Sequence, residues 1–81
     1  MNNLNYEALV ILAEECAEVI QEVSKIQRFH NDHTNLEKEI GDLLCMVDLA
    51  RQYGYISWDK IAEYKQAKRE KLKEFSNLKG L

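Results

Sequence analysis

The sequence predicts a small all-α protein, and three observations support this. The 81 residues include no proline and only three glycines, so the turn-forming residues that usually separate β-strands are scarce. Glu, Lys, Leu, Ala and Gln are abundant, and these residues favour helices. Apolar residues recur at i, i+3 and i+4 spacing along three segments. We therefore expect a single domain over residues 1–81, with helices over about 5–29, 35–53 and 58–76.

The first predicted helix, 5–29, carries one broad apolar stripe. Asn3 or Asn5 can cap its beginning. At 100° per residue, the stripe comprises Leu9, Leu12, Cys16, Val19, Ile20, Val23 and Ile26. We expect this stripe to be the core face. Cys16 and Cys45, which both lie within helical patterns, are then expected to be small reduced core residues.

Acidic residues crowd one side of this helix. They are Glu14, Glu15, Glu18 and Glu22. No Lys or Arg stands four residues after any of them, so their repulsion is not relieved within the helix. Ile11 and Phe29 share the same flank, which is therefore not a plain solvated surface. The alternative is a solvated helix face whose charges pair with lysines elsewhere in the chain.

The second predicted helix, 35–53, follows a polar turn over 30–33. Thr34 and Glu37 have the spacing of a capping box at its beginning. Its apolar stripe comprises Leu36, Ile40, Leu43, Leu44, Val47 and Ala50. The short connection favours an antiparallel hairpin with the first helix.

A second carboxylate pair, Glu39 and Asp42, lies beside that stripe. Both residues fall on the flank that also carries Met46, Leu49 and Tyr53. Apolar neighbours remove water from a carboxylate, and this is costly unless a positive charge compensates it. On the first helix Glu15 and Glu18, three residues apart, form the other pair, and the two pairs, if they face each other, could hold a divalent cation between the helices.

Metal identity follows from the ligand type. Carboxylate oxygens suit hard cations, so Mg²⁺, or Mn²⁺ in its place, is favoured over Zn²⁺. A di-iron site in a helical bundle is the competing metal hypothesis, but it requires Glu-x-x-His pairs on helices. Both histidines, His30 and His33, lie instead in the predicted loop.

The third predicted helix, 58–76, has a basic gap in its apolar face. Gly54 is suited to end the preceding helix and Ser57 to begin this one. Its apolar face comprises Trp58, Ile61, Leu72 and, more loosely, Phe75. Lys65 and Lys68 occupy the positions between Ile61 and Leu72 where leucines would be expected, and Arg69 is adjacent. The lysines either extend their ammonium groups into water or face an anion such as a polyphosphate.

Composition excludes several other functions. The net charge is -3, which argues against a nucleic-acid partner because such proteins usually carry a basic excess. No apolar run approaches the roughly 20 residues of a membrane span, and the first residues lack the pattern of a signal peptide. We therefore expect a cytoplasmic protein with no membrane partner.

The acidic motifs together resemble those of a known family. The pattern EExxE over 14–18 is followed, after twenty residues, by ExxD over 39–42 within the segment EIGDLL. This arrangement is similar to the signature of the MazG-like all-α nucleoside triphosphate pyrophosphohydrolases, which are relatives of the dimeric dUTPases. The resemblance extends from about Leu9 to Leu72.

The resemblance implies an Mg²⁺-dependent enzyme that hydrolyses a nucleoside or deoxynucleoside triphosphate to the monophosphate and pyrophosphate. The metal ligands it implies are Glu15, Glu18, Glu39 and Asp42. Glu14 would orient or deprotonate the attacking water, and the phosphate-binding residues would be Lys65, Lys68 and Arg69.

Assembly and alternatives complete the prediction. The resemblance implies helical bundles formed by dimers or tetramers. A minimal three-helix chain also has more apolar face than it can cover alone, so we expect a homodimer or homotetramer. One alternative is a non-catalytic helical dimer that binds a nucleotide or a partner. Another is a structural interaction domain whose carboxylates are only surface charge.

Overall fold

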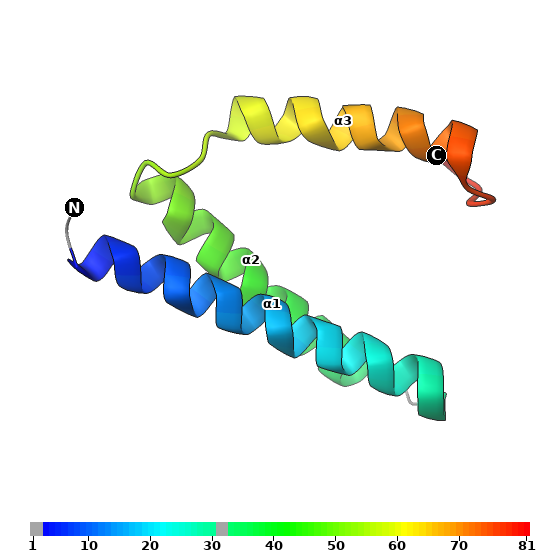
Figure 1. Cartoon of the computed structure of the whole chain (residues 1–81), viewed down its shortest axis with the longest axis horizontal. Helices are drawn as coiled ribbons and strands as arrows, with labels where there is room; N and C mark the ends of the chain where they lie inside the picture. The colour runs from blue at the N-terminus through cyan, green and yellow to red at the C-terminus, as the bar shows by residue number, and fades with distance from the viewer. Residues whose placement is uncertain (1–2, 31–32) are drawn as a thin grey trace.

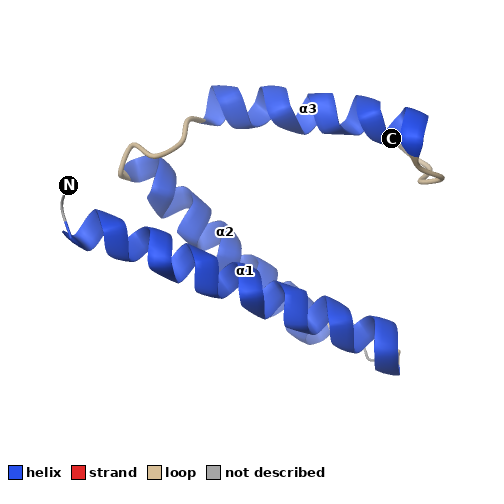
Figure 2. Cartoon of the chain, in the orientation of Figure 1, coloured by secondary structure: helices blue, strands red, loops and turns tan. Residues whose placement is uncertain are grey.

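The structure is a computed structural model that describes residues 3–30 and 33–81, with side chains from Tyr6 onward (Figure 1). Its helices are α1 (Asn3–Phe29), α2 (Thr34–Gln52) and α3 (Trp58–Phe75). The described chain contains helices and loops but no strand (Figure 2). This confirms the predicted all-α class, and each predicted helix end lies within about two residues of the observed one.

α1 and α2 form the predicted antiparallel hairpin and pack on each other along most of their length (Figure 1). α3 turns away after α2 and runs apart from α1, so its packing on the other described helices is slight. At the corner, the Arg51 guanidinium lies 5.8 Å from the centre of the Trp58 ring, a cation–π contact between α2 and α3. None of the described helices is both long enough and apolar enough to cross a membrane.

The predicted turn between α2 and α3 is confirmed in detail. Gly54 has a φ of 85°, and its N–H donates to the Arg51 carbonyl while the Tyr55 N–H donates to the Ala50 carbonyl. This pair of bonds is a Schellman motif with glycine in its left-handed position. Ser57 caps α3 as predicted, since its hydroxyl accepts from the Lys60 N–H at 3.3 Å.

The beginning of α2 differs from the prediction by one residue. Thr34 is the first helical residue rather than the cap, and His33 occupies the cap position without a capping bond from its side chain. The Glu37 N–H instead donates to the His33 carbonyl at 3.1 Å. The predicted capping side chains of Asn3 and Asn5 lie outside the described side chains. Residues 31–32 of the predicted turn lie outside the described chain.

The hairpin buries the predicted faces only in part, and Ala50 of the predicted second stripe is among its most buried residues. The buried apolar residues of the described chain are Ala8, Met46 and Ala50. Met46 belongs to the carboxylate-bearing flank rather than to the predicted stripe. Two helices in a hairpin bury one face each, and here they bury the faces that carry Ile11 and Met46.

The predicted core stripes are therefore only partly covered within one chain. Ile20 is 68% exposed and Leu44 is 56% exposed, contrary to the prediction. Cys16 and Cys45 are also exposed, so the prediction that they are core residues is wrong for the single chain, although both thiols are free as expected. We call the exposed part of the two stripes the outer apolar face, which consists of Cys16, Ile20, Val23, Ile40 and Leu44.

The dimensions of the chain reflect this incomplete burial. Its accessible surface is 6708 Å², whereas a compact monomer of this mass exposes about 5,000 Å². Its radius of gyration is 15.2 Å, against roughly 12 Å for a compact domain of this length. The excess of both quantities has the same origin, which is the separation of α3 from the hairpin.

Candidate functional site

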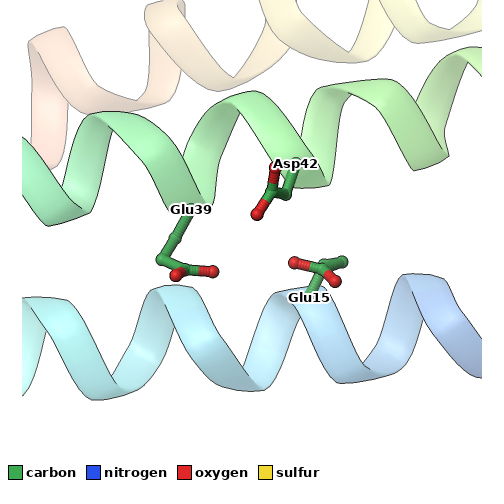
Figure 3. A group of neighbouring side chains, drawn as sticks. All are labelled: Glu15, Glu39 and Asp42. Atoms are coloured by element: carbon green, nitrogen blue, oxygen red, sulfur yellow. The ribbon is translucent and has the colours of Figure 1, made fainter.

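Three carboxylates converge between α1 and α2. Glu15 extends from α1 toward Glu39 and Asp42 on α2 (Figure 3). One oxygen from each residue lies within 4.8 Å of the others. We call this group the carboxylate cluster. Contact between the flanks of Ile11 and Met46 brings it together, because Glu15 lies one turn after Ile11, while Asp42 and Glu39 lie one and two turns before Met46 on the same helix face. The prediction that the two acidic flanks face each other is confirmed for these three residues.

The helices shield two of the three carboxylates of the cluster, Glu39 and Glu15, from water. The Glu39 side chain is only 14% exposed, and Glu15 is half-buried. Burial raises the pKa of Glu15 above its usual value, and the negative charges of Asp42, Glu39 and Glu18 raise it further. Carboxylates in this arrangement favour the binding of a positive charge.

One lysine supplies such a charge. Lys38 donates from its Nζ to Asp42 Oδ2 at 2.9 Å and to Glu39 Oε1 at 3.4 Å. The hydrogen bond with Asp42 and the charges of both carboxylates raise the pKa of Lys38. The charge of Lys38 opposes the upward shift in the pKa of Glu15. Lys38 therefore partly compensates the cluster.

Sequence reasoning missed Lys38. The periodic pattern places it on the polar side of the second helix, opposite the apolar stripe. The available signal was its spacing: Lys38 and Asp42 are four residues apart, which places them one turn from each other. Lys38 precedes the acidic pair of α2, so a search for basic residues after the glutamates of α1 does not find it.

The remaining acidic candidates lie at the edge of the cluster. Glu18 is exposed and is not among the three converging residues, but its charge reaches Glu15. Glu14 is exposed and also stands outside the cluster. Glu22 pairs with Lys25 at 3.2 Å. The structure thus brings together three of the four predicted metal ligands in one chain.

The predicted phosphate-binding residues lie together on α3. Lys65, Lys68 and Arg69 line an open groove of about 420 Å³ whose other lining residues are Ile61, Tyr64 and Leu72. The interruption of the apolar face by basic residues is therefore real. The structure does not bring this groove to the carboxylates of the same chain, because α3 is separate from the hairpin (Figure 1).

A smaller hollow lies between α1 and α2, beside the cluster. Its volume is about 200 Å³, and its lining residues are Glu7, Ala8, Ile11, Met46, Leu49 and Tyr53. Ile11 stands one turn before Glu15, and Met46 stands one turn after Asp42. The hollow is thus a largely apolar space adjoining the carboxylates.

The donor set of the cluster fits a hard divalent cation. Three carboxylates offer only oxygen, which Mg²⁺ and Mn²⁺ prefer. With Mg–O bonds of about 2.1 Å, opposite ligands of an octahedral ion lie about 4.2 Å apart. Neighbouring ligands of such an ion lie about 3 Å apart, so the oxygens of the cluster, which lie within 4.8 Å of one another, would move closer together around a bound ion.

Comparison with known protein families identifies a match over most of the chain. The family model of the MazG nucleotide pyrophosphohydrolase domain matches residues 5–74, which is most of the chain. No curated protein matches the sequence. No solved structure matches the chain either.

Proposed function

Because this chain belongs to the MazG family of nucleotide pyrophosphohydrolases, we propose that it hydrolyses a nucleoside or deoxynucleoside triphosphate to the monophosphate and pyrophosphate. In this reaction water is the nucleophile and the anhydride bond between the α- and β-phosphates breaks. The observation that carries the proposal is the convergence of Glu15, Glu39 and Asp42 from two helices. Isolated acidic residues on helix surfaces would not support it.

The cluster is proposed to hold Mg²⁺, with Mn²⁺ as a possible replacement. Glu15, Glu39 and Asp42 are the ligands from the cluster, and Glu18 adds a fourth carboxylate at its open edge. When bound, the cation supplies the positive charge that phosphoryl transfer to water requires. The partial burial of Glu39 limits its rotation, so this residue holds its oxygens in place before substrate arrives.

Glu14 is proposed to handle the attacking water. It precedes the ligand Glu15 and its side chain is exposed, so water has access to its carboxylate. It would orient this water and accept its proton as the new P–O bond forms. The leaving pyrophosphate carries the electrons of the broken bond.

The nucleoside is proposed to occupy the hollow beside the cluster. Ile11, Met46 and Leu49 offer an apolar wall, and Tyr53 adds an aromatic ring with a polar end. A base in this hollow would place its phosphates toward the carboxylates, because the hollow adjoins them along the helix axes. This supports a nucleotide as the substrate rather than free pyrophosphate.

Assembly of two or four chains is proposed to complete the site. Lys65, Lys68 and Arg69 would bind the phosphate tail, but α3 holds them away from the cluster of their own chain. The outer apolar face and the excess exposed surface support a second copy as its cover. A homodimer or homotetramer would bury this face and allow α3 of one chain to approach the cluster of its neighbour.

Pyrophosphate release tests the proposal. The full chain would be incubated with Mg²⁺ and a panel of common and modified nucleoside and deoxynucleoside triphosphates. We expect turnover of at least one, and a loss of about 100-fold or more in Glu15→Gln and Asp42→Asn. Asp48→Asn is the matched control, since it makes the same change at an exposed residue of α2 and should retain activity.

Other outcomes separate the alternatives. If no triphosphate is turned over, or if Glu18→Gln and Asp42→Asn both keep full activity, the catalytic proposal is wrong. Binding of a nucleotide without release of pyrophosphate would favour the non-catalytic helical dimer. Absence of any nucleotide or cation binding would leave the structural interaction domain.

A further inference from the structure

We propose that Lys38 is the resident counter-ion of the carboxylate cluster, and that it leaves the carboxylates when a divalent cation binds. This inference rests on the cation site of the proposed function. Its basis is geometric: Lys38 Nζ lies 2.9 Å from Asp42 Oδ2 and 3.4 Å from Glu39 Oε1, so it bridges two of the three cluster residues.

The contact with Glu39 distinguishes Lys38 from an ordinary helix ion pair. Spacing of four residues explains the contact with Asp42, because these residues stand one turn apart. Adjacent residues such as Lys38 and Glu39 point about 100° apart on a helix and do not face each other. The ammonium nevertheless reaches Glu39, so the side chain bends over the cluster rather than away from it.

No other basic side chain performs this role within the described residues. The remaining ion pairs of lysines are Lys25–Glu22, Lys60–Glu63 and Lys73–Glu70. None of them includes a cluster residue. The three carboxylates therefore depend on Lys38 for compensation in the metal-free chain.

Lys38 is also easily displaced. Its side chain is 67% exposed, and an exposed ion pair contributes little free energy. A flexible four-carbon stem allows the ammonium to move into water. A divalent cation bound to the same oxygens would repel the ammonium at short range, so the two are alternative occupants.

Competition of this kind has a measurable consequence. Lys38→Gln removes the competing charge, so we expect Mn²⁺ to bind about twofold to fivefold more tightly, the equivalent of one exposed ion pair. In the metal-free state the same substitution leaves the carboxylates uncompensated. We therefore expect its unfolding temperature in EDTA to fall, and the difference from wild type to shrink when Mn²⁺ is added.

The experiment is a titration of the full chain with Mn²⁺ alone, followed by calorimetry or by the electron paramagnetic resonance signal of free Mn²⁺. Lys25→Gln is the matched control. Its partner, Glu22, has the same 14% exposure as Glu39 but lies outside the cluster. This control should bind Mn²⁺ as the wild type does.

Three results overturn the inference. Equal affinity in wild type, Lys38→Gln and Lys25→Gln would show that Lys38 does not compete, while the cation site itself would stand. Weaker binding by Lys38→Gln would show that the lysine positions the ligands instead. If even the wild type does not bind Mn²⁺, the cation site of the proposed function fails, and the inference fails with it.

Discussion

Glu15 is the residue at which the charges of the cluster meet. Burial raises its pKa most, and the acidic residues Asp42, Glu39 and Glu18 raise it further while Lys38 opposes them. The folded chain therefore binds a proton at Glu15 more tightly than the unfolded chain does. Stability must then fall as pH rises through the interval between the ordinary pKa of Glu and the raised one.

Glu15→Gln should remove this pH dependence. The amide has nearly the shape of the carboxylic acid and stays neutral at every pH. We expect the metal-free variant to unfold at a higher temperature than the wild type at pH 7, and the difference to vanish below the ordinary pKa of Glu. Circular dichroism melts in EDTA between about pH 4 and pH 8 would measure it.

Glu74→Gln, the same substitution on an exposed position of α3, controls for the loss of one negative charge. A Glu15→Gln variant that is less stable than wild type at neutral pH would contradict the predicted repulsion. Added Mn²⁺ should reverse the order, because the wild-type ligand then has a charge to bind.

Helix spacing was enough to predict which residues form this site, but it was not enough to predict which side chains contact each other. Glu15, Glu39 and Asp42 were predicted because residues three apart share a flank, and the flank continues into apolar residues. The position of Glu18 outside the cluster depends on the side-chain conformation and on the exact rotation of α1. Neither quantity is encoded in a periodic pattern, and the same is true of the bend of Lys38 toward Glu39.

At the level of elements, the turn after α2 sets the direction in which α3 leaves. Gly54 has a φ of 85°, a backbone conformation in which residues with an L side chain are strained. We expect Gly54→Ala to lower the free energy of unfolding by about 1 kcal/mol, although an added Cβ meets no atom within 4 Å. Urea denaturation of the two proteins would measure the loss.

Gly80→Ala is a matched control, because Gly80 has a φ of 78° and equally open surroundings. It follows the end of α3, where a change of backbone conformation displaces no helix. We expect its stability to equal that of the wild type. Equal losses from both substitutions would mean that the Schellman turn contributes nothing beyond local strain.

The existence and ends of the helices were predictable, but the choice of packing face was not. Each of α1 and α2 has apolar residues on two faces, and a periodic pattern does not tell which face meets the neighbouring helix of the same chain. The stripe containing Ile20 was the more apolar and was assigned to the core. In the hairpin Ile20 stays exposed, while the flanks that contain Ile11 and Met46 also face the space between the helices. Gly54 and Ser57 were predictable because each performs its role through local backbone geometry.

For the whole molecule, the outer apolar face is the surface proposed to bind a second copy. Leu44 is 56% exposed in the single chain, so Leu44→Glu should do little harm to the hairpin itself. In the assembly it would bury a charge, and we expect the dissociation constant to rise by about 100-fold or more, equivalent to about 3 kcal/mol. Sedimentation velocity would show a shift toward the 9.5 kDa chain.

Val10→Glu is the control, because Val10 is an exposed apolar residue of α1 outside the outer apolar face. This variant should sediment as the wild type does. A wild-type protein that sediments as a stable folded monomer at micromolar concentration would contradict the proposed assembly. A Leu44→Glu variant with unchanged sedimentation would show that the chains meet through another surface.

The interior of the hairpin is small, and this bears on how the folded fraction depends on the concentration of the chain. Ala8, Met46 and Ala50 are few buried residues with which to stabilise a chain, so on the proposed assembly folding and association become one equilibrium. The fraction of folded enzyme would then depend on how much of the chain is synthesised. At low concentrations of the chain, the activity would then rise more than in proportion to the total concentration of the chain. On the proposed assembly, a change in synthesis alone would therefore change the activity by a larger factor than the amount of chain.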